Sequence, residues 1–260
     1  YPIHEIIVVD DASTVDLSSV AARDPRIRYL RQPVNAGANA ARNLGLRCAN
    51  GDLIAYLDDD DAWRPDKIAR QVESFADETV EASLCGLRTP NAGASGAGKV
   101  QVQPITQVTE AMLRRGNPFC GMSGLVARRE ALLAEPFDEG LPAGQDWDVY
   151  VRLARRAPLA YVAAPLFTRD YGGHDGITLS ARQETPQQLL ARARVLEKHR
   201  AWLGEWHYRT RLASYLLKYV SRRPAALSYL RFALRRAGLL PTANYILRHA
   251  LGRDMTARAD

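Results

Sequence analysis

The chain has 260 residues, of which 47% are hydrophobic and 25% are charged, so it can bury a sizeable core in one large domain, with or without an appendage. No apolar run reaches the roughly 18 residues that a membrane-spanning helix needs, and the start lacks the features of a secretory signal. We therefore expect a cytoplasmic protein, and not a membrane-spanning or secreted one. The net charge of +6 is uneven: residues 1–185 hold 20 Lys and Arg against 25 Asp and Glu, whereas residues 186–260 hold 15 against 4.

Strands and helices alternate in the first part of the chain. The segment Glu5–Val9 (EIIVV) is β-branched and apolar, which is typical of a strand buried on both faces of a parallel sheet, and two aspartates follow it. Further strands are predicted at 26–31 and 53–57, and helices at 36–49 and from Pro65 onward. This alternation predicts an α/β fold.

The later part of the chain changes from mixed structure to helices. The pattern predicts a strand at 81–87, a surface loop at 91–98, a helix near 106–115, a strand near 123–128 and a helix at 145–156. From residue 186 onward it predicts helices only, with breaks near Gly204, Pro224 and Pro241. We therefore predict a domain at 1–185 and a basic helical extension at 186–260.

Four consecutive aspartates, Asp58 to Asp61, follow the strand at 53–57. Adjacent carboxylates repel one another, so this arrangement costs stability unless a cation compensates. Mg²⁺ and Mn²⁺ are bound by one or two carboxylates together with substrate phosphates, and open α/β folds place ligands at the C-terminal ends of their strands. The run therefore predicts a metal site, with a solvated acidic turn as the alternative.

Four motifs of this chain resemble one family. They are VVDDAS (8–13), NAGANAARNLG (35–45), GDLIAYLDDDDAWRPDK (51–67) and GQDWDVYVRLAR (144–155). In this order and spacing they resemble the family 2 glycosyltransferases, which are inverting enzymes with the GT-A fold. The resemblance implies a Rossmann-like mixed sheet flanked by helices, here with a C-terminal helical extension. It also implies transfer from a UDP, dTDP or GDP sugar to a hydroxyl of a glycan, polysaccharide or lipid-linked acceptor, as in cell-envelope polysaccharide biosynthesis.

The same resemblance assigns donor-binding roles to three residues. Asp10 and Asp11 match the acidic pair that contacts the base and ribose, and Arg42 matches an arginine that contacts the nucleotide. The alternative for the acidic pair is to cap the start of a helix, a task that Ser13 would share. The alternative for Arg42 is an internal ion pair.

Asp58 and Asp60 match the family's Asp-x-Asp motif. By this resemblance Asp60 contacts a Mn²⁺ or Mg²⁺ ion directly, whereas Asp58 or Asp59 lies nearer the ribose or a metal-bound water. His174, in RDYGGHDGITLS (169–180), matches a late histidine that completes the metal shell or touches the diphosphate. Its alternative is an exposed side chain in a glycine-rich loop.

Asp146 matches the carboxylate that acts as catalytic base, although Gln145 stands where the family has glutamate. The base deprotonates the acceptor hydroxyl as it attacks the anomeric carbon. A helix cap is the alternative for Asp146, and the two roles are compatible. Asp148, two residues on, is the weaker candidate for the base.

The basic segment 186–260 has apolar residues at helical spacing. Its helices are predicted either to pack on the domain or to contact the inner face of the cell membrane peripherally, and no nucleic-acid motif accompanies their charge. The chain begins a few residues before VVDD, without the strand that opens family members. We expect either a fragment or a shortened variant. Without that strand an edge of the sheet would be exposed, and a homodimer is one way to cover it. The competing function is a non-catalytic domain that binds sugar nucleotides.

Overall fold

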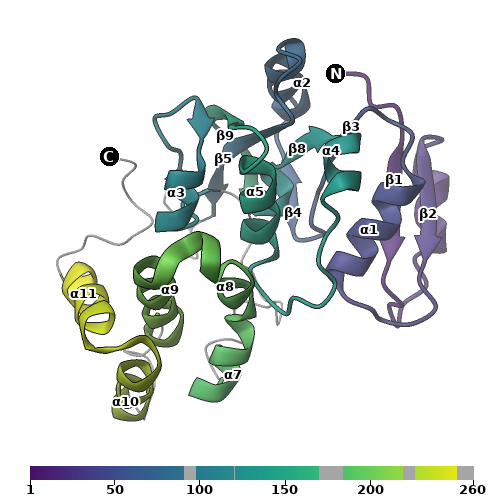
Figure 1. The fold of residues 1–260 in the computed structure, drawn as a ribbon. Helices are drawn as coiled ribbons and strands as arrows, with labels where there is room; N and C mark the ends of the chain where they lie inside the picture. Colours follow the sequence, from purple (N-terminus) through teal and green to yellow (C-terminus); the bar gives the residue numbers. More distant parts are fainter. Residues whose placement is uncertain (91–97, 120, 170–183, 219–225, 251–260) are drawn as a thin grey trace. The chain divides into compact units, whose positions relative to one another are not determined.

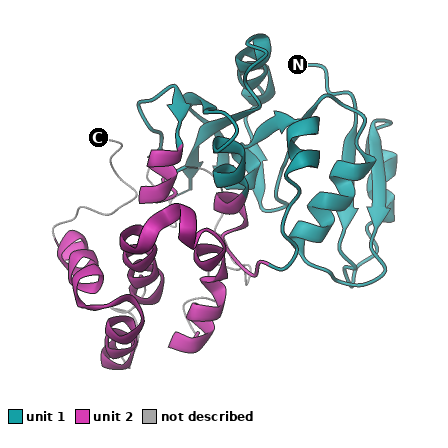
Figure 2. Ribbon diagram, viewed as in Figure 1, with its two compact units in different colours: residues 1–109, 119–140, 149–170 teal, residues 110–118, 141–148, 171–260 magenta. Residues whose placement is uncertain are grey.

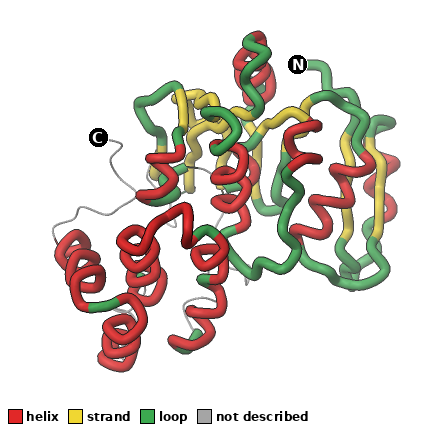
Figure 3. The backbone as a smooth tube through the Cα atoms, viewed as in Figure 1, coloured by secondary structure: helices red, strands yellow, loops and turns green. Residues whose placement is uncertain are grey.

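The computed structural model describes residues 1–90, 98–119, 121–169, 184–218 and 226–250. The chain divides into two compact units (Figure 2). Unit 1 comprises residues 1–109, 119–140 and 149–170, and unit 2 comprises residues 110–118, 141–148 and 171–260. Within the described residues all strands belong to unit 1, whereas unit 2 is built of helices and loops (Figure 3).

Unit 1 begins with a parallel pair of strands, β1 (Ile6–Asp10) and β2 (Ile27–Arg31). A 3-10 helix, η1 (Ser18–Arg23), lies between them in the chain, and α1 (Ala38–Cys48) packs on β1 (Figure 1). At Gly45 of α1 an added Cβ atom would make an ordinary van der Waals contact, 3.4 Å from Cγ2 of Val9. β1 ends at Asp10, and the next residue, Asp11, contacts the backbone just ahead of α1.

The main sheet of unit 1 has seven strands in the order β3-β8-β5-β9-β4, with β6 paired to β5 and β7 paired to β9. Its strands are β3 (Leu53–Ala55), β4 (Asp61–Trp63), β5 (Ala82–Thr89), β6 (Lys99–Gln101), β7 (Gln107–Val108), β8 (Val126–Arg128) and β9 (Leu159–Arg169). Among the described strands of this sheet, β5 and β9 alone pair in parallel, and the other pairings are antiparallel. The sheet is therefore mixed.

The core of the main sheet centres on β5, whose residues 82–87 are all buried. A bulge interrupts its pairing with β9 at Gly86, where a Cβ atom would come within 2.5 Å of Val102 and 3.0 Å of the Ala164 carbonyl. Only glycine fits this approach. Helices α2 (Lys67–Val72) and α4 (Arg129–Ala134) and the 3-10 helices η2 (Glu73–Ala76) and η3 (Met122–Gly124) complete the unit outside α5.

Several elements differ from the sequence-based prediction. The strand at 5–9 is not buried on both faces of a large parallel sheet, because β1 pairs only with β2 among the described residues and is mostly half-buried. The helix expected to open at Pro65 begins at Lys67, after a turn. Part of the predicted helix near 106–115 is β7, and part of the strand near 123–128 is η3. The loop predicted at 91–98 lies almost entirely outside the described residues.

Unit 2 contains α3 (Glu110–Arg115), α7 (Pro186–Arg192), α8 (Arg194–Lys198), α9 (Arg200–Leu217), α10 (Ala226–Ala237) and α11 (Leu239–Ala250). Gly204, with φ of 72°, kinks α9, and Gly238, with φ of 93°, separates α10 from α11. Pro241 lies in the first turn of α11, where its missing N–H costs little, and so does not break the helix. No helix among the described residues is long and apolar enough to cross a bilayer.

Helix α5 (Gln145–Ala154) contributes to both units, since the division falls between Asp148 and Val149. Its first turn is held within unit 2. Asp148, which is 1% exposed, accepts hydrogen bonds or ion pairs from His199 (2.7 Å) and Lys198 (2.9 Å). Trp147 donates its indole N–H to the carbonyl of Leu113 (2.9 Å). These contacts fix the N-terminal end of α5.

Candidate donor, metal and base residues

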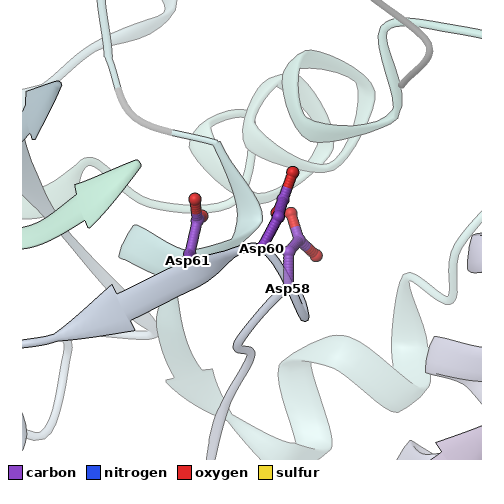
Figure 4. A group of neighbouring side chains, drawn as sticks. All are labelled: Asp58, Asp60 and Asp61. Carbon is purple, nitrogen blue, oxygen red and sulfur yellow. The ribbon is translucent and has the colours of Figure 1, made fainter. Parts of the chain in front are cut away.

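Three carboxylates converge at the turn between β3 and β4. Asp58, Asp60 and Asp61 each offer an oxygen within 4.8 Å of the others, and Figure 4 shows the three side chains next to one another. The amide of Asp61 donates to the carbonyl of Asp58 (3.1 Å) and closes the turn. The amide of Asp58 donates to Oγ of Ser123 (2.9 Å), which lies just ahead of β8, the partner of β3. Sheet pairing therefore positions the acidic turn.

Asp61 lies in surroundings that oppose its negative charge. Burial raises the pKa of this carboxyl to about 6, with Asp60 and Asp58 adding to the rise and Ser123 and Arg169 opposing it. Its Oδ1 is buried and has no hydrogen-bond partner among the described residues. A divalent cation would satisfy this oxygen and neutralise the neighbouring carboxylates, and oxygen ligands suit Mg²⁺ and Mn²⁺. The residues present therefore fit the metal that the motif predicts.

Arg42 reaches the acidic turn from α1. Its Nη2 donates to Oδ1 of Asp58 (2.6 Å), its Nη1 donates to Oδ1 of Asn39 (3.3 Å), and its Cζ lies 5.7 Å from the centre of the Phe137 ring. The Arg42 and Asp58 side chains remain 14% and 27% exposed. The internal ion pair, one of the two alternatives for Arg42, is therefore present. A role toward the nucleotide stays a prediction.

Asp10 is held in place by its neighbours on β2. The Tyr29 hydroxyl and Arg31 Nη1 both donate to its Oδ2 at 2.5 Å, and the amide of Ser13 donates to its Oδ1 (2.8 Å). These hydrogen bonds, with that of Tyr29 the largest effect, lower the pKa of Asp10 to about 2. Asp10 therefore stays ionised at neutral pH, and its contact with a donor stays a prediction.

Asp11 stabilises the chain ahead of α1. Its carboxylate accepts from the amides of Ala36 (2.8 Å) and Gly37 (2.7 Å), and Gly37 is the cap residue of that helix. The side chain of Asn35 donates to the carbonyl of Asp11 (3.1 Å). Asp11 thus orders the loop ahead of α1, although no described side chain caps α1 itself. The contact of Asp11 with the ribose stays a prediction.

Asp146, the predicted base, lies in the first turn of α5 and in unit 2. Its Oδ2 accepts a hydrogen bond from the side chain of Asn117 (3.0 Å), which follows α3 in the same unit. Burial lowers the pKa of Arg211 of α9, and the charge of Asp146 is one of the effects that oppose this shift. Asn117 therefore orients the candidate base, and neither Asn117 nor Arg211 stood out in the sequence.

The other residues of the acidic run and His174 differ in where the structure places them. Asp59 is exposed beside the acidic turn and is not part of the three-carboxylate cluster. Asp61 belongs to that cluster, although the motif pointed to Asp58 and Asp60. His174 lies outside the described residues. The partner of the turn, Ser123, carries no signal in the sequence beyond its place ahead of an apolar strand.

Comparison with known proteins gives relatives for both the sequence and the fold. A glycosyl transferase of Escherichia coli K12 named for colanic acid biosynthesis, WcaA, is 29% identical over 161 residues, which cover 57% of this chain and 55% of that protein. The chain thus spans about half the length of this relative.

Two solved structures share the fold. The first is Staphylococcus aureus TarS 1–349 in complex with UDP-GlcNAc, with a TM-score of 0.62 and 16% identity over 96% of this chain and 79% of that one. The second is the Pyrobaculum calidifontis mannosyltransferase PcManGT in complex with GDP-Man and Mn²⁺, with a TM-score of 0.54 and 20% identity over 97% and 74%. They confirm the predicted GT-A-like arrangement, a mixed α/β sheet with helices and a C-terminal helical region.

The family model for glycosyl transferase family 2 matches residues 1–134, which include β1, β2 and the acidic turn. This match covers just over half of the 260 residues. The chain belongs to glycosyl transferase family 2.

Proposed function

We propose that this protein transfers a sugar, with inversion, from a nucleotide-diphosphate sugar to an acceptor hydroxyl, with a divalent metal bound at Asp58, Asp60 and Asp61. The observation that carries the proposal is the convergence of these three carboxylates within 4.8 Å, with Oδ1 of Asp61 lacking a partner in the part of the chain that the structure describes. The structural relatives support it, because one was solved with UDP-GlcNAc and the other with GDP-Man and Mn²⁺. When bound, the metal would neutralise the diphosphate and the charge that develops on it.

The chain's own residues would position the donor around this site. Asp10, ionised at neutral pH, would accept hydrogen bonds from the base or ribose, and Asp11 would do so beside the loop that it orders. Arg42, fixed by Asp58, would present its planar guanidinium to the nucleotide. The predicted contributions of Asp59 and His174 to donor and metal binding remain part of the proposal.

Asp146 would accept the proton of the acceptor hydroxyl. Asn117 donates to Oδ2 and so orients the carboxylate, while Oδ1 makes no hydrogen bond among the described residues. A positioned carboxylate of this kind is what an inverting displacement requires. Gln145 beside it carries no charge, so orientation of the acceptor cannot depend on a second carboxylate at that position.

For the acceptor we propose a polysaccharide or lipid-linked glycan of the cell envelope. The support is the colanic acid relative of Escherichia coli. Peripheral membrane contact through residues 186–260, a homodimer and a cytoplasmic location remain predictions.

Donor hydrolysis tests the proposal without an acceptor. We expect the chain to release nucleotide diphosphate from a UDP, dTDP or GDP sugar with Mn²⁺, and Asp60→Asn and Asp146→Asn each to lower the rate by roughly 100-fold or more. Asp60→Asn should also weaken Mn²⁺ binding, whereas Asp146→Asn should leave it unchanged. Asp52→Asn, an exposed carboxylate just ahead of β3, is the matched control.

Two results would contradict the proposal. Hydrolysis that survives both substitutions would remove Asp60 and Asp146 from the chemistry. Metal-dependent nucleotide binding without turnover of any donor would favour the non-catalytic binding domain instead.

A further inference from the structure

Unit 2 contains a cavity of about 130 Å³ between helices α3, α9 and α11. It is lined by Arg114, Arg115, Trp206, His207, Thr210, Arg211, Asn244 and Arg248. Since one water occupies roughly 10–15 Å³ of such space, the cavity has room for a polyatomic ion such as phosphate. Every lining residue belongs to unit 2, so the cavity is a feature of that unit alone.

The lining is strongly cationic. Four of the eight residues are arginines and none is acidic. Arg211 is 8% exposed and is held rigidly, because its Nη1 donates to the Leu113 carbonyl (2.7 Å) and its Cζ stacks 3.9 Å from the centre of the Trp147 ring. Burial lowers the pKa of Arg211 to about 10, so it remains charged at neutral pH.

Two lining groups lack the partners that buried polar atoms normally have. Thr210 is 5% exposed, and its Oγ1 makes no hydrogen bond among the described residues. The Nε of Arg114 is buried and also unpaired there. Burial, with the charge of Arg114 next, lowers the pKa of His207, and a hydrogen bond to the backbone of Leu203 opposes this shift. One lining pair is satisfied internally, since Nε of Arg248 donates to Oδ1 of Asn244 (3.2 Å). Thr210 Oγ1 and Arg114 Nε are the buried lining atoms left without a partner among the described residues.

We propose that this cavity binds a phosphate group, as a monoester or diester. Arginine forks match phosphate oxygens in geometry, and charge-assisted hydrogen bonds to them are strong. A cavity of this size, partly open to solvent, takes one such group, whereas a nucleic acid is bound along an extended basic surface.

The position of the cavity suggests where the phosphate comes from. Arg211, which lines it, stacks on Trp147, the neighbour in the chain of Asp146, the proposed base. The phosphate would therefore belong to the acceptor, either a phosphate-bearing soluble glycan or the head of a lipid. This last step rests on the proposed function, whereas binding of phosphate to the cavity does not.

Calorimetric titration of the full chain with inorganic phosphate, at constant ionic strength against chloride, tests the cavity directly. The variant Arg115→Gln/Arg248→Gln removes its two exposed arginines. The matched control is Arg231→Gln/Arg235→Gln, which removes the same charge from exposed positions of α10. We expect the dissociation constant for phosphate to rise roughly tenfold or more in the cavity variant and to stay almost unchanged in the control.

A second variant and a second ligand complete the design. Thr210→Val removes only the hydroxyl and should weaken phosphate binding several-fold while circular dichroism stays unchanged. Flotation with phosphatidylcholine vesicles, with and without phosphatidic acid, separates a lipid source from a soluble one: binding that depends on Arg115 and Arg248 but not on the control pair supports a lipid phosphate.

The proposal is overturned if the protein binds neither phosphate nor the phosphatidic acid vesicles. It is also overturned if the cavity variant and the control lose binding equally, because general surface charge would then explain the effect. Neither measurement requires turnover. Failure of the cavity and failure of the transferase proposal are therefore distinguishable.

Discussion

At the scale of single residues, Asp10 shows how a predicted ligand-binding group is also part of the fold. Its carboxylate accepts hydrogen bonds from Tyr29, Arg31 and Ser13, and its pKa falls from an ordinary 3.8 to about 2. A lowered pKa in the folded state means that the ionised form stabilises the fold above about pH 4, and that this stabilisation is lost as the pH falls toward 2.

Tyr29→Phe should therefore change the pH dependence of stability. Loss of its hydrogen bond raises the pKa of Asp10 toward its ordinary value, so the variant should be less stable at pH 7. It should also lose less stability than the wild type between pH 4 and pH 2. Urea unfolding at a series of pH values measures both. Tyr56→Phe is the control, since the Tyr56 hydroxyl makes no hydrogen bond among the described residues.

The sequence located the acidic turn because a run of aspartates directly after an apolar strand is a strong local signal. It did not single out Asp61 from its neighbours, since membership of the cluster depends on the turn that the Asp61 amide closes. Asn117 and Ser123 escaped notice for a similar reason. Asn117 bonds to the carboxylate of Asp146, 29 residues away in the chain, and Ser123 bonds to the amide of Asp58, 65 residues away, so both contacts depend on tertiary packing.

At the scale of elements, α1 is tied to the loop after α4 by two buried side chains, Asn39, which donates to the carbonyl of Asp138 (2.7 Å), and Asn43. Asn43, 4% exposed, donates to the carbonyl of Phe137 (2.9 Å) and accepts from the Phe137 amide (2.9 Å). It also donates to Glu139 (2.8 Å). Since Arg42 is the residue just before Asn43, this tie also sets the face of α1 that meets the acidic turn.

Asn43→Ala should destabilise the protein by about 2–3 kcal/mol, because both backbone groups of Phe137 lose their partner in a buried place. Urea unfolding at pH 7 gives the difference in free energy. Arg47→Ala, at an exposed position of the same helix, should change it by less than about 0.5 kcal/mol. Equal effects of the two substitutions would refute the role given to Asn43.

The elements that the sequence predicted well were those with local signals, such as β2, α1 and α5. It missed β9 as a strand, although β9 is the longest and pairs with three others, because proline and alanine interrupt its apolar pattern. The pairing of β1 with β2 apart from the main sheet was also not predicted. Strand pairing depends on contacts distant in sequence, which periodicity does not report.

At the scale of the whole molecule, binding of a ligand should raise the free energy of unfolding. A nucleotide sugar that binds only the folded chain at 100 times its dissociation constant contributes about 2.7 kcal/mol. For a chain of this size that is a rise in melting temperature of roughly 5–10 °C. We expect at least one UDP, dTDP or GDP sugar to give such a rise with Mn²⁺ in a thermal-shift panel.

EDTA should abolish this rise, because the acidic turn needs a cation to accept a diphosphate. A shift of the same size with and without EDTA would argue against a metal at Asp58, Asp60 and Asp61. Asp60→Asn in the same panel would then distinguish a donor site elsewhere in the chain from a metal-free site at the turn.

The contacts of Asp148 limit how family members can be recombined. Its partners, Lys198 and His199, belong to the helical region, and so does Arg211, which stacks on Trp147. Replacing residues 186–260 alone with the tail of a relative would leave Asp148 as a buried carboxylate with mismatched neighbours. A chimera designed to change acceptor choice should therefore carry over residues 110–118 and 141–148 together with the new tail, with its junction inside α5.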